Sequence, residues 1–223
     1  MIVAAVPVKD VVNAKQRLMP VLEGVERSEL ARAMLVDVLR ALAGARLDQV
    51  WVVTREPAVA AIARRLGAEP LIETDNRGHT AAVAVAQAEA ARVGAAAFLT
   101  IPGDVPCVSA AELRVLTSAL GPAPAAVFAP SRSGRGTNGA LLAPAAVMRL
   151  RFGEPSFDDH LAAARALAIE PRVVRLRGLG LDVDAPGDLL ALLAEGAGTE
   201  SRALLERWRL PERLAGVRPI ARR

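Results

Sequence analysis

The sequence predicts an α/β protein with a doubly wound, mostly parallel sheet in a single domain. Short apolar runs typical of buried strands alternate with segments whose apolar residues recur at helical spacing. The apolar residues, 52% of the 223, are spread along the whole length, and a chain of this size can bury a full core. Because such a sheet presents ligands at the carboxyl ends of its strands, we expect the functional groups in the loops that follow strands.

The first half of the chain is predicted to alternate strands and helices. Ile2–Val6 is expected to be the first strand, and Ser28–Ala43 a helix that ends at Gly44. Pro57 is a typical first residue of the next helix, which Gly67 terminates. The remaining elements expected in this half are strands at 50–54, 68–72 and 95–101, a helix at 80–92, and a helix that opens with the capping box 109–112.

The second half is less regular. Strands are expected at 125–129 and 138–143, on either side of the glycine-rich turn 131–137. The elements expected after them are a helix at 156–168, a strand at 172–176 and a last core helix that ends near 195. We therefore assign residues 1–198 to one domain and residues 199–223 to a basic C-terminal tail, an appendage to that domain.

The charge of the chain is concentrated in that tail. The formal net charge is +4, and residues 199–223 hold seven arginines and three glutamates, so residues 1–198 are formally neutral. A neutral body argues against nucleic acid as a partner, and a chain with no tyrosine and four phenylalanines offers few rings for base stacking. No apolar run is long enough for a signal peptide or a membrane span, which predicts a cytoplasmic protein with no membrane partner. The lone Cys107 cannot form an intramolecular disulfide, which agrees with a reducing compartment.

Both lysines of the chain lie in the loop after the first expected strand. The chain has 26 arginines but only these two lysines, Lys9 and Lys15, and Arg17 follows them in the same loop. At the carboxyl edge of a sheet, compact ammonium groups are suited to a phosphate chain. The alternative is a solvated basic loop with no ligand, and the loop alone favours neither interpretation.

Three aspartates are expected at the same edge. Asp104 follows a strand and is held between a glycine and a proline, while Asp182 and Asp184 are two residues apart and face the same side of an extended segment. Mg²⁺ binds few protein carboxylates and completes its octahedron with phosphate and water. Carboxylates that face lysines and a triphosphate therefore predict Mg²⁺-dependent nucleotidyl transfer. For Asp184 the alternative is a helix N-cap, because Ala185-Pro186 follows it.

Polar residues of two turns form a second candidate group. Thr137 and Asn138, in a glycine-rich turn, would suit a phosphate or carboxylate, although a hairpin connection explains the same residues. Ser156 leads into a helix whose N-terminus attracts anions, and capping alone is the alternative. His79 and His160 are expected to be loop or helix-surface residues, because neither has metal-ligand neighbours at useful spacing.

Five motifs, taken in order, resemble those of one enzyme family. They are VPVK (6–9) with AKQRL (14–18), PGDVP (102–106), GRGTN (134–138), RFG (151–153) with SF (156–157), and LDVDAP (181–186). Together they resemble the guanylyltransferases of deazaflavin coenzyme biosynthesis, whose acceptors are 2-phospho-L-lactate, phosphoenolpyruvate or 3-phospho-D-glycerate. Single motifs of this kind are weak, but five in sequence are specific.

The resemblance implies a nucleotidyltransferase (Rossmann-like) domain over residues 1–198, GTP as donor, Mg²⁺ as cofactor and a small phosphorylated three-carbon acid as acceptor. It also implies pyrophosphate release and a downstream transferase that receives the unstable product. The implied roles are triphosphate binding and catalysis for Lys9, Lys15 and Arg17, nucleotide binding for Pro7 and Gly78, metal binding for Asp104 (also catalytic), Asp182 and Asp184, and acceptor binding for Thr137, Asn138, Gly153, Ser156 and Cys107.

Two positions depart from the pattern of the family. Gly78-His79-Thr80 stands where relatives have Gly-Leu-Asn, which leaves open the contact to the nucleotide base. Cys107 stands where many relatives have leucine. A smaller, slightly polar wall at this point would favour 3-phospho-D-glycerate over phosphoenolpyruvate, with 2-phospho-L-lactate third.

Two other functions are compatible with the sequence. A molybdopterin- or sugar-type nucleotidyltransferase shares the fold and the metal carboxylates, although its first loop is glycine-rich where this chain has Pro7-Val8-Lys9. A non-catalytic nucleotide-binding protein with a basic interaction tail is the alternative from another class. The sequence leaves open the acceptor, a homodimer and the role of the tail.

Overall fold

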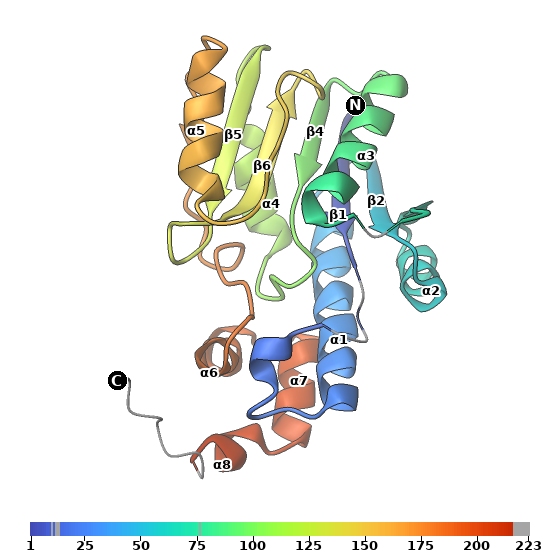
Figure 1. The fold of residues 1–223 in the computed structure, drawn as a ribbon, viewed down its shortest axis with the longest axis vertical. Helices are drawn as coiled ribbons and strands as arrows, with labels where there is room; N and C mark the ends of the chain where they lie inside the picture. The colour runs from blue at the N-terminus through green and yellow to red at the C-terminus, as the bar shows by residue number, and fades with distance from the viewer. Residues whose placement is uncertain (10, 12–13, 76, 216–223) are drawn as a thin grey trace.

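A seven-stranded sheet with the order β3-β2-β1-β4-β6-β5-β7 runs through the computed structural model, which describes residues 1–9, 11, 14–75 and 77–215 (Figure 1). β6 runs antiparallel to both β4 and β5, whereas the other pairings are parallel. The mostly parallel α/β sheet expected from the sequence is therefore confirmed. The strands are β1 (Ile2–Pro7), β2 (Gln49–Thr54), β3 (Glu69–Ile72), β4 (Ala97–Thr100), β5 (Ala125–Pro130), β6 (Thr137–Ala143) and β7 (Arg172–Val173).

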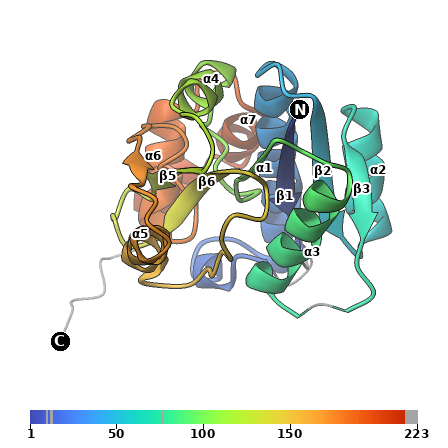
Figure 2. The same ribbon diagram turned by 90° about the horizontal axis from the view of Figure 1, so that it is seen from above.

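Helices cover both faces of the sheet, as a doubly wound fold requires (Figure 2). Side chains alternate between the faces along β1: Ala4 and Val6 pack with α1, α2 and α4, and Val3 and Ala5 pack with α3 and α5. The helices are α1 (Gly24–Ala43), α2 (Pro57–Arg65), α3 (His79–Arg92), α4 (Ala110–Ser118), α5 (Ser156–Ala166), α6 (Pro186–Glu195), α7 (Glu200–Arg207) and α8 (Leu210–Ala215), with a short 3-10 helix at Gln16–Leu18.

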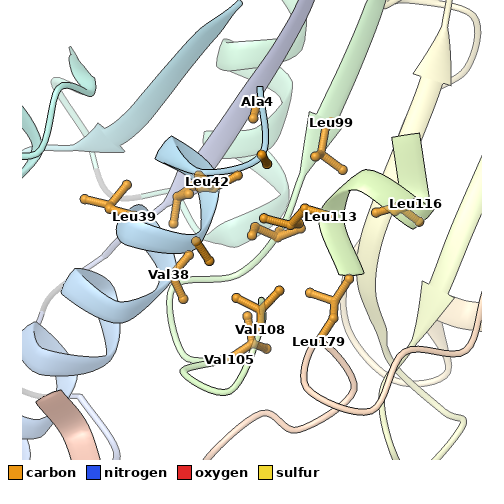
Figure 3. Packing of buried hydrophobic residues seen from close by; sticks show 14 of the residues in the cluster. Ala4, Val38, Leu39, Leu42, Leu99, Val105, Val108, Leu113, Leu116 and Leu179 are labelled. Carbon is orange, nitrogen blue, oxygen red and sulfur yellow. The ribbon is translucent and has the colours of Figure 1, made fainter. Parts of the chain in front are cut away.

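The loop that follows β4 is anchored in the core between α1 and α4. Val105 and Val108 of this loop are buried, and Figure 3 shows them below Val38 of α1 and Leu113 of α4. Asp104 immediately precedes Val105, so burial of the valine holds the aspartate at the carboxyl end of β4. Core packing thus positions a residue that the sequence places in the candidate site.

Two elements have a boundary that differs from the sequence-based prediction by three or more residues. α1 begins at Gly24 and not at Ser28, because the Glu26 carboxylate accepts the backbone N–H of Glu23 at 2.9 Å and caps an earlier turn. β7 covers only two of the five residues expected at 172–176, because it pairs with β5 alone at the sheet edge, over Val127 and Phe128.

The beginning of the basic tail is part of the core. Leu205 of α7 and Leu210 of α8 are fully buried in one cluster with Leu30 and Met34 of α1. Figure 1 shows α7 beside the N-terminal half of α1, and α6 and α8 pack against α7. For residues 200–210 the expectation of an appendage was therefore wrong, since apolar burial attaches them to α1. The domain boundary at residue 198 stays a prediction.

Several predicted features fall on parts of the chain that the structure leaves undescribed. Asp10 and Asn13 of the basic loop lie outside the described residues, as do Arg218, Arg222 and Arg223 of the tail. Among the helices that are described, none combines the length and apolar character needed to cross a membrane.

Candidate active site

A cleft with two adjoining lobes opens at the carboxyl edge of the parallel strands. The lobes have volumes of about 440 and 640 Å³ and share Lys9, His79, Asp104 and Asp184. The cleft brings together twelve of the thirteen predicted site residues: Pro7, Lys9, Lys15, Arg17, Gly78, Asp104, Thr137, Asn138, Gly153, Ser156, Asp182 and Asp184. The thirteenth, Cys107, lines neither lobe.

The two lobes differ in chemical character. The first lies against α1 and is lined by apolar side chains, including Val8, Met34 and Leu35. The second is lined by hydroxyl, amide and charged groups and by backbone near Gly136 and Gly153. The cleft therefore offers an apolar wall beside a polar, partly cationic one.

Lys15 joins two loops across the cleft. Its Nζ lies 2.5 Å from Oδ2 of Asp104 and 2.7 Å from Oδ1 of Asp184, and its side chain is only 8% exposed. Burial lowers the pKa of Lys15, but the negative charges of Asp104 and Asp184 outweigh it, so the pKa is raised overall. The solvated-loop alternative is therefore wrong for Lys15, although Lys9 and Arg17 are exposed at the cleft surface.

A backbone hydrogen bond draws the second aspartate segment to the first. The N–H of Val183 donates to the carbonyl oxygen of Asp104 at 3.0 Å, and Val183 is buried. Asp182 and Asp184 on either side of it both line the polar lobe, as their spacing predicts. Burial raises the pKa of Asp182, and the charges of Asp104 and Asp184 raise it further.

Asn138 supports Asp182 instead of facing the lobe freely. Its Nδ2 donates to Oδ1 of Asp182 at 3.1 Å and to the carbonyl oxygen of Leu179 at 3.0 Å. Both amide hydrogens are therefore used within the protein. Asn138 lines the cleft, but this arrangement makes it a support for a carboxylate.

The alternative role of Asp184 as a helix N-cap is wrong. Ala185 occupies the N-cap of α6, and the Asp188 carboxylate accepts the backbone N–H groups of Asp184 (3.0 Å) and Ala185 (2.7 Å). Because Asp188 serves the helix end, the Asp184 side chain is free to bind Lys15. The carboxylate of Asp184 thus belongs to the cleft.

The carboxylates of the cleft fit a cation that takes few protein ligands. Oδ1 of Asp104 is buried and has no hydrogen-bond partner within the described part of the chain, and the pKa of nearby Asp182 is raised by burial. No group of three or more His, Cys, Asp or Glu side chains in the described residues forms a preformed metal cage. The carboxylates of Asp104 and Asp182, with no further protein ligands grouped around them in the described residues, are suited to Mg²⁺. This ion takes its other ligands from phosphate and water.

Thr137, Ser156 and His160 form a buried polar cluster beside the second lobe. The Ser156 hydroxyl accepts the backbone N–H of Thr137 at 3.1 Å, and Oγ1 of Thr137 lies 2.9 Å from Nδ1 of His160. His160 is 2% exposed, so its expected place on a helix surface was wrong. It lies one turn after Ser156 on α5, a spacing that puts both residues on one helix face.

His79 closes one side of the cleft at the start of α3. Its ring contacts that of Phe152 edge-on with centroids 4.6 Å apart, and burial lowers the pKa of His79 to about 4. The Thr80 hydroxyl accepts the backbone N–H of Phe152 at 2.9 Å, which ties this helix end to the loop before α5. Gly78 has a φ of 101°, which favours glycine at this turn.

Cys107 lies outside both lobes of the cleft. It is partly buried and packs at the margin of the cluster that contains Leu18, Leu189 and Leu205. Burial raises the pKa of the Cys107 thiol to about 11, with the charge of Glu195 adding to the rise. The geometry of the cleft therefore gives no support to the expected role of Cys107 in acceptor choice.

Several side chains that line the cleft were not among the predicted site residues, including His79, Phe152 and Met34 of α1. His160 lies behind the cleft, where it contacts Thr137. Its signal in the sequence was its position four residues after Ser156 in a helix. Met34 reaches the cleft only because α1 packs beside loops that are distant from it in sequence.

The sheet and the cleft at its edge define the class of the protein as a nucleotidyltransferase fold. The structure is similar to a putative nucleotide-diphospho-sugar transferase from Desulfovibrio desulfuricans G20, with a TM-score of 0.72 at 18% identity over 95% of this chain and 96% of that one. This likeness shows the fold. It covers almost the whole of both chains, in agreement with a single α/β domain.

Sequence comparison then gives the family. The family model described as "Guanylyl transferase CofC like" matches residues 2–214. The chain is 39% identical to the phosphoenolpyruvate guanylyltransferase of Rubrobacter xylanophilus, over 86% of this chain and 94% of that protein. It is 35% identical to the 2-phospho-L-lactate guanylyltransferase of Methanothermobacter thermautotrophicus, over 92% and 90%. The protein belongs to the guanylyl transferase CofC-like family of enzymes, and the resemblance found in its motifs is confirmed.

Proposed function

We propose that the protein transfers GMP from GTP to a small phosphorylated three-carbon acid and releases pyrophosphate. The observation that carries the proposal is the junction of the two lobes, where Lys15 meets Asp104 and Asp184. A donor triphosphate placed there faces ammonium groups, and an acceptor in the polar lobe faces hydroxyl groups and backbone N–H groups. This arrangement supports transfer between two anionic substrates better than it supports binding of one.

The donor fits the first lobe. Its apolar wall on α1 suits the base and ribose of a nucleotide, and Lys9, Lys15 and Arg17 would hold the triphosphate at its open end. Pro7 brings backbone close to the same space, and Gly78 lines the adjoining second lobe. Compact ammonium groups suit phosphate oxygens that change position during transfer.

The acceptor fits the second lobe. Thr137, Ser156 and Gly153 lie together there, and the open space over Gly153, whose φ is 134°, admits an anion close to the backbone. The helix α5 begins at Ser156, so its N-terminal partial positive charge also faces this lobe. We assign the acceptor carboxylate or phosphate to this group.

Transfer requires positioning and charge stabilisation more than acid–base chemistry. An acceptor phosphate oxygen attacks the α-phosphorus of GTP in line, a new P–O bond forms, and the bond to the bridging oxygen of pyrophosphate breaks. Asp104 and Asp182 would hold Mg²⁺, which supplies charge neutralisation at the phosphates when bound. Lys15 and Lys9 stabilise negative charge on the leaving pyrophosphate. A phosphate monoester is largely ionised near neutral pH, so the site needs no strong general base.

Phosphoenolpyruvate is the acceptor we propose first. The sequence-based preference for 3-phospho-D-glycerate rested on Cys107, which lies outside the cleft. Curated relatives at 36–39% identity carry the name phosphoenolpyruvate guanylyltransferase, and one at 35% carries the name 2-phospho-L-lactate guanylyltransferase. With this acceptor, the enzyme would act in deazaflavin coenzyme biosynthesis in the cytoplasm and pass its unstable product to a downstream transferase.

A turnover screen tests the proposal. Pyrophosphate release is measured with GTP, ATP or CTP against phosphoenolpyruvate, 2-phospho-L-lactate and 3-phospho-D-glycerate, each with and without Mg²⁺. We expect release with GTP and phosphoenolpyruvate in the presence of Mg²⁺, and none when the acceptor is omitted. Release with CTP or ATP alone among the nucleotides would support a sugar- or molybdopterin-type enzyme, and no release under any condition would support a non-catalytic nucleotide-binding protein.

A further inference from the structure

His160 has both ring nitrogens engaged, although it does not line the cleft. The backbone N–H of Arg151 lies 3.0 Å from Nε2, and Oγ1 of Thr137 lies 2.9 Å from Nδ1. A backbone amide can only donate, so Nε2 must accept and carries no hydrogen. In a neutral imidazole the hydrogen is then on Nδ1, which donates it to Oγ1 of Thr137.

The surroundings of the ring hold it in this state. His160 is 2% exposed, stacks on Phe128 with ring centroids 5.3 Å apart and an interplanar angle of 7°, and meets the edge of Phe152 at 5.2 Å. Burial lowers the pKa of His160 to about 4, although the neighbouring charge of Asp159 acts in the opposite direction. The ring therefore stays neutral near pH 7, with one defined donor.

This donor decides which way the Thr137 hydroxyl points. Its oxygen accepts from His160 at 2.9 Å and, weakly, from the Ser156 hydroxyl at 3.5 Å. Its own hydrogen has no acceptor among the described residues, while Thr137 lines the polar lobe. If His160 carried its hydrogen on Nε2, the threonine would donate to Nδ1 and turn a lone pair toward the lobe, where it would repel an anion.

We propose that His160 is a positioning residue for the acceptor: its Nδ1–H holds the Thr137 hydroxyl as a hydrogen-bond donor to an anionic group in the second lobe. The identity of that group as the phosphate or carboxylate of the acceptor rests on the proposed function. His160 itself touches neither substrate. Its effect should therefore appear in acceptor binding and not in GTP binding.

Two substitutions of His160 distinguish a positioning role from a role in packing alone. His160→Gln places an amide oxygen near the position of Nε2, which keeps an acceptor for Arg151 and removes the donor to Thr137. His160→Asn places an amide nitrogen near the position of Nδ1, which keeps the donor and removes the acceptor for Arg151. We expect His160→Gln to raise KM for the acceptor about tenfold and His160→Asn less than about threefold, with KM for GTP unchanged in both.

The Thr137→Val background gives the matched control. Here the hydroxyl is already absent, so His160→Gln should change KM for the acceptor by less than about twofold. Equal rises of acceptor KM in the Gln and Asn variants would overturn the proposal. A full tenfold effect of His160→Gln in the Thr137→Val background would overturn it as well.

An NMR measurement tests the hydrogen position without any enzymatic activity. The chain has two histidines, so ¹⁵N-histidine spectra of the full chain can be assigned with a His79→Asn variant. We expect the Nδ1–H tautomer for His160 at about pH 7 and no titration down to about pH 5.5. An Nε2–H tautomer, or a ring that titrates in this range, would overturn the inference. A wild-type protein that turns over no acceptor would instead remove the proposed function and leave this measurement decisive for His160.

Discussion

The two carboxylate oxygens of Asp104 have different surroundings in the cleft. One carboxylate oxygen pairs with Lys15, and the other is buried with no hydrogen-bond partner among the described residues. A buried, unpartnered carboxylate oxygen is costly unless a ligand completes it. We therefore expect Asp104 to bind a cation, because no described residue of the protein partners this oxygen.

Asparagine substitutions test the metal carboxylates. We expect Asp104→Asn and Asp182→Asn each to lower kcat/KM by at least about 10³-fold, because each removes a charged ligand. Asp184→Asn should act more mildly, since the Asp184 side chain is more exposed than that of Asp104. Steady-state rates at saturating Mg²⁺, with circular dichroism to verify folding, give the result. Near-normal rates in either of the first two variants would take that residue out of the metal site.

His160 also has a consequence for stability. In the unfolded chain a histidine has a pKa of about 6.5, whereas burial lowers the pKa of folded His160 to about 4. Below about pH 6.5 the unfolded state binds the proton more readily, so acidification favours unfolding. The stabilising contribution is complete above this pH and is lost as the pH falls toward 4.

Urea unfolding at two pH values measures this effect. Between about pH 7.5 and pH 5.0, wild type should lose about 2 kcal/mol more unfolding free energy than His160→Gln, which has no titrating group at this position. His79 is present in both proteins, so its own titration cancels in the comparison. Equal losses in the two proteins would show that the folded ring is not held neutral.

Helix α7 is attached to α1 by hydrogen bonds to Asp37 and by burial of Leu205. Asp37, on the buried face of α1, accepts the backbone N–H groups of Glu200 and Ser201 at 2.7 and 2.9 Å and the Ser201 hydroxyl at 2.7 Å. These bonds satisfy the first N–H groups of α7, which have no partner within the helix. Asp37, more than 160 positions earlier in the chain, thus binds the first two N–H groups of α7, while the N-cap residue Thr199 accepts the N–H of Arg202 at 3.2 Å.

Leucine truncations show how much the helix contributes. Leu205 is fully buried, whereas Leu190 on neighbouring α6 is 54% exposed. We expect Leu205→Ala to lower the unfolding free energy by about 3 kcal/mol through lost burial and a cavity, and Leu190→Ala to lower it by less than about 1 kcal/mol. Denaturant titration of both variants gives the comparison. A small effect at Leu205 would restore the interpretation of this segment as an appendage.

The cleft of the domain has two lobes that share the carboxylates of Asp104 and Asp184. The loop after β1, the loop after β4 and the segment before α6 meet through Lys15, Asp104 and Val183. Any ligand that bridges these segments should stabilise the folded state in proportion to its binding. We therefore expect binding of GTP and Mg²⁺, as proposed, to change the stability of the entire chain.

Thermal unfolding with ligands tests that coupling. We expect GTP with Mg²⁺ to raise Tm by several degrees, at about 100-fold excess over Kd, and GTP with a chelator to raise it much less. The Asp104→Asn variant should lose the Mg²⁺-dependent part of the shift and keep the part due to GTP alone. A shift that ignores Mg²⁺ would show that the ion does not bind between the protein and the triphosphate.

Short-range patterns in the sequence were enough to predict the order of helices and strands and most of the residues that line the cleft. Strand and helix periods, with stop residues such as Gly44, depend on neighbours within one or two turns, so the order of elements could be predicted. The loops after parallel strands meet at one edge by geometry, which is why Lys15, Asp104 and Asp182 could be assigned to one edge before their contacts were known.

Burial and pairing required the folded chain, because their partners are remote in sequence. Lys15 binds Asp104 and Asp184 across 89 and 169 positions, and no local pattern encodes either contact. The same limit applies to His160, whose neutral state comes from the packing of Phe128 and Phe152 around it. The sequence thus determines which chemical groups reach the cleft. The packing of distant segments determines their charge, their hydrogen-bond direction and which predicted site residues, like Cys107, lie outside the cleft.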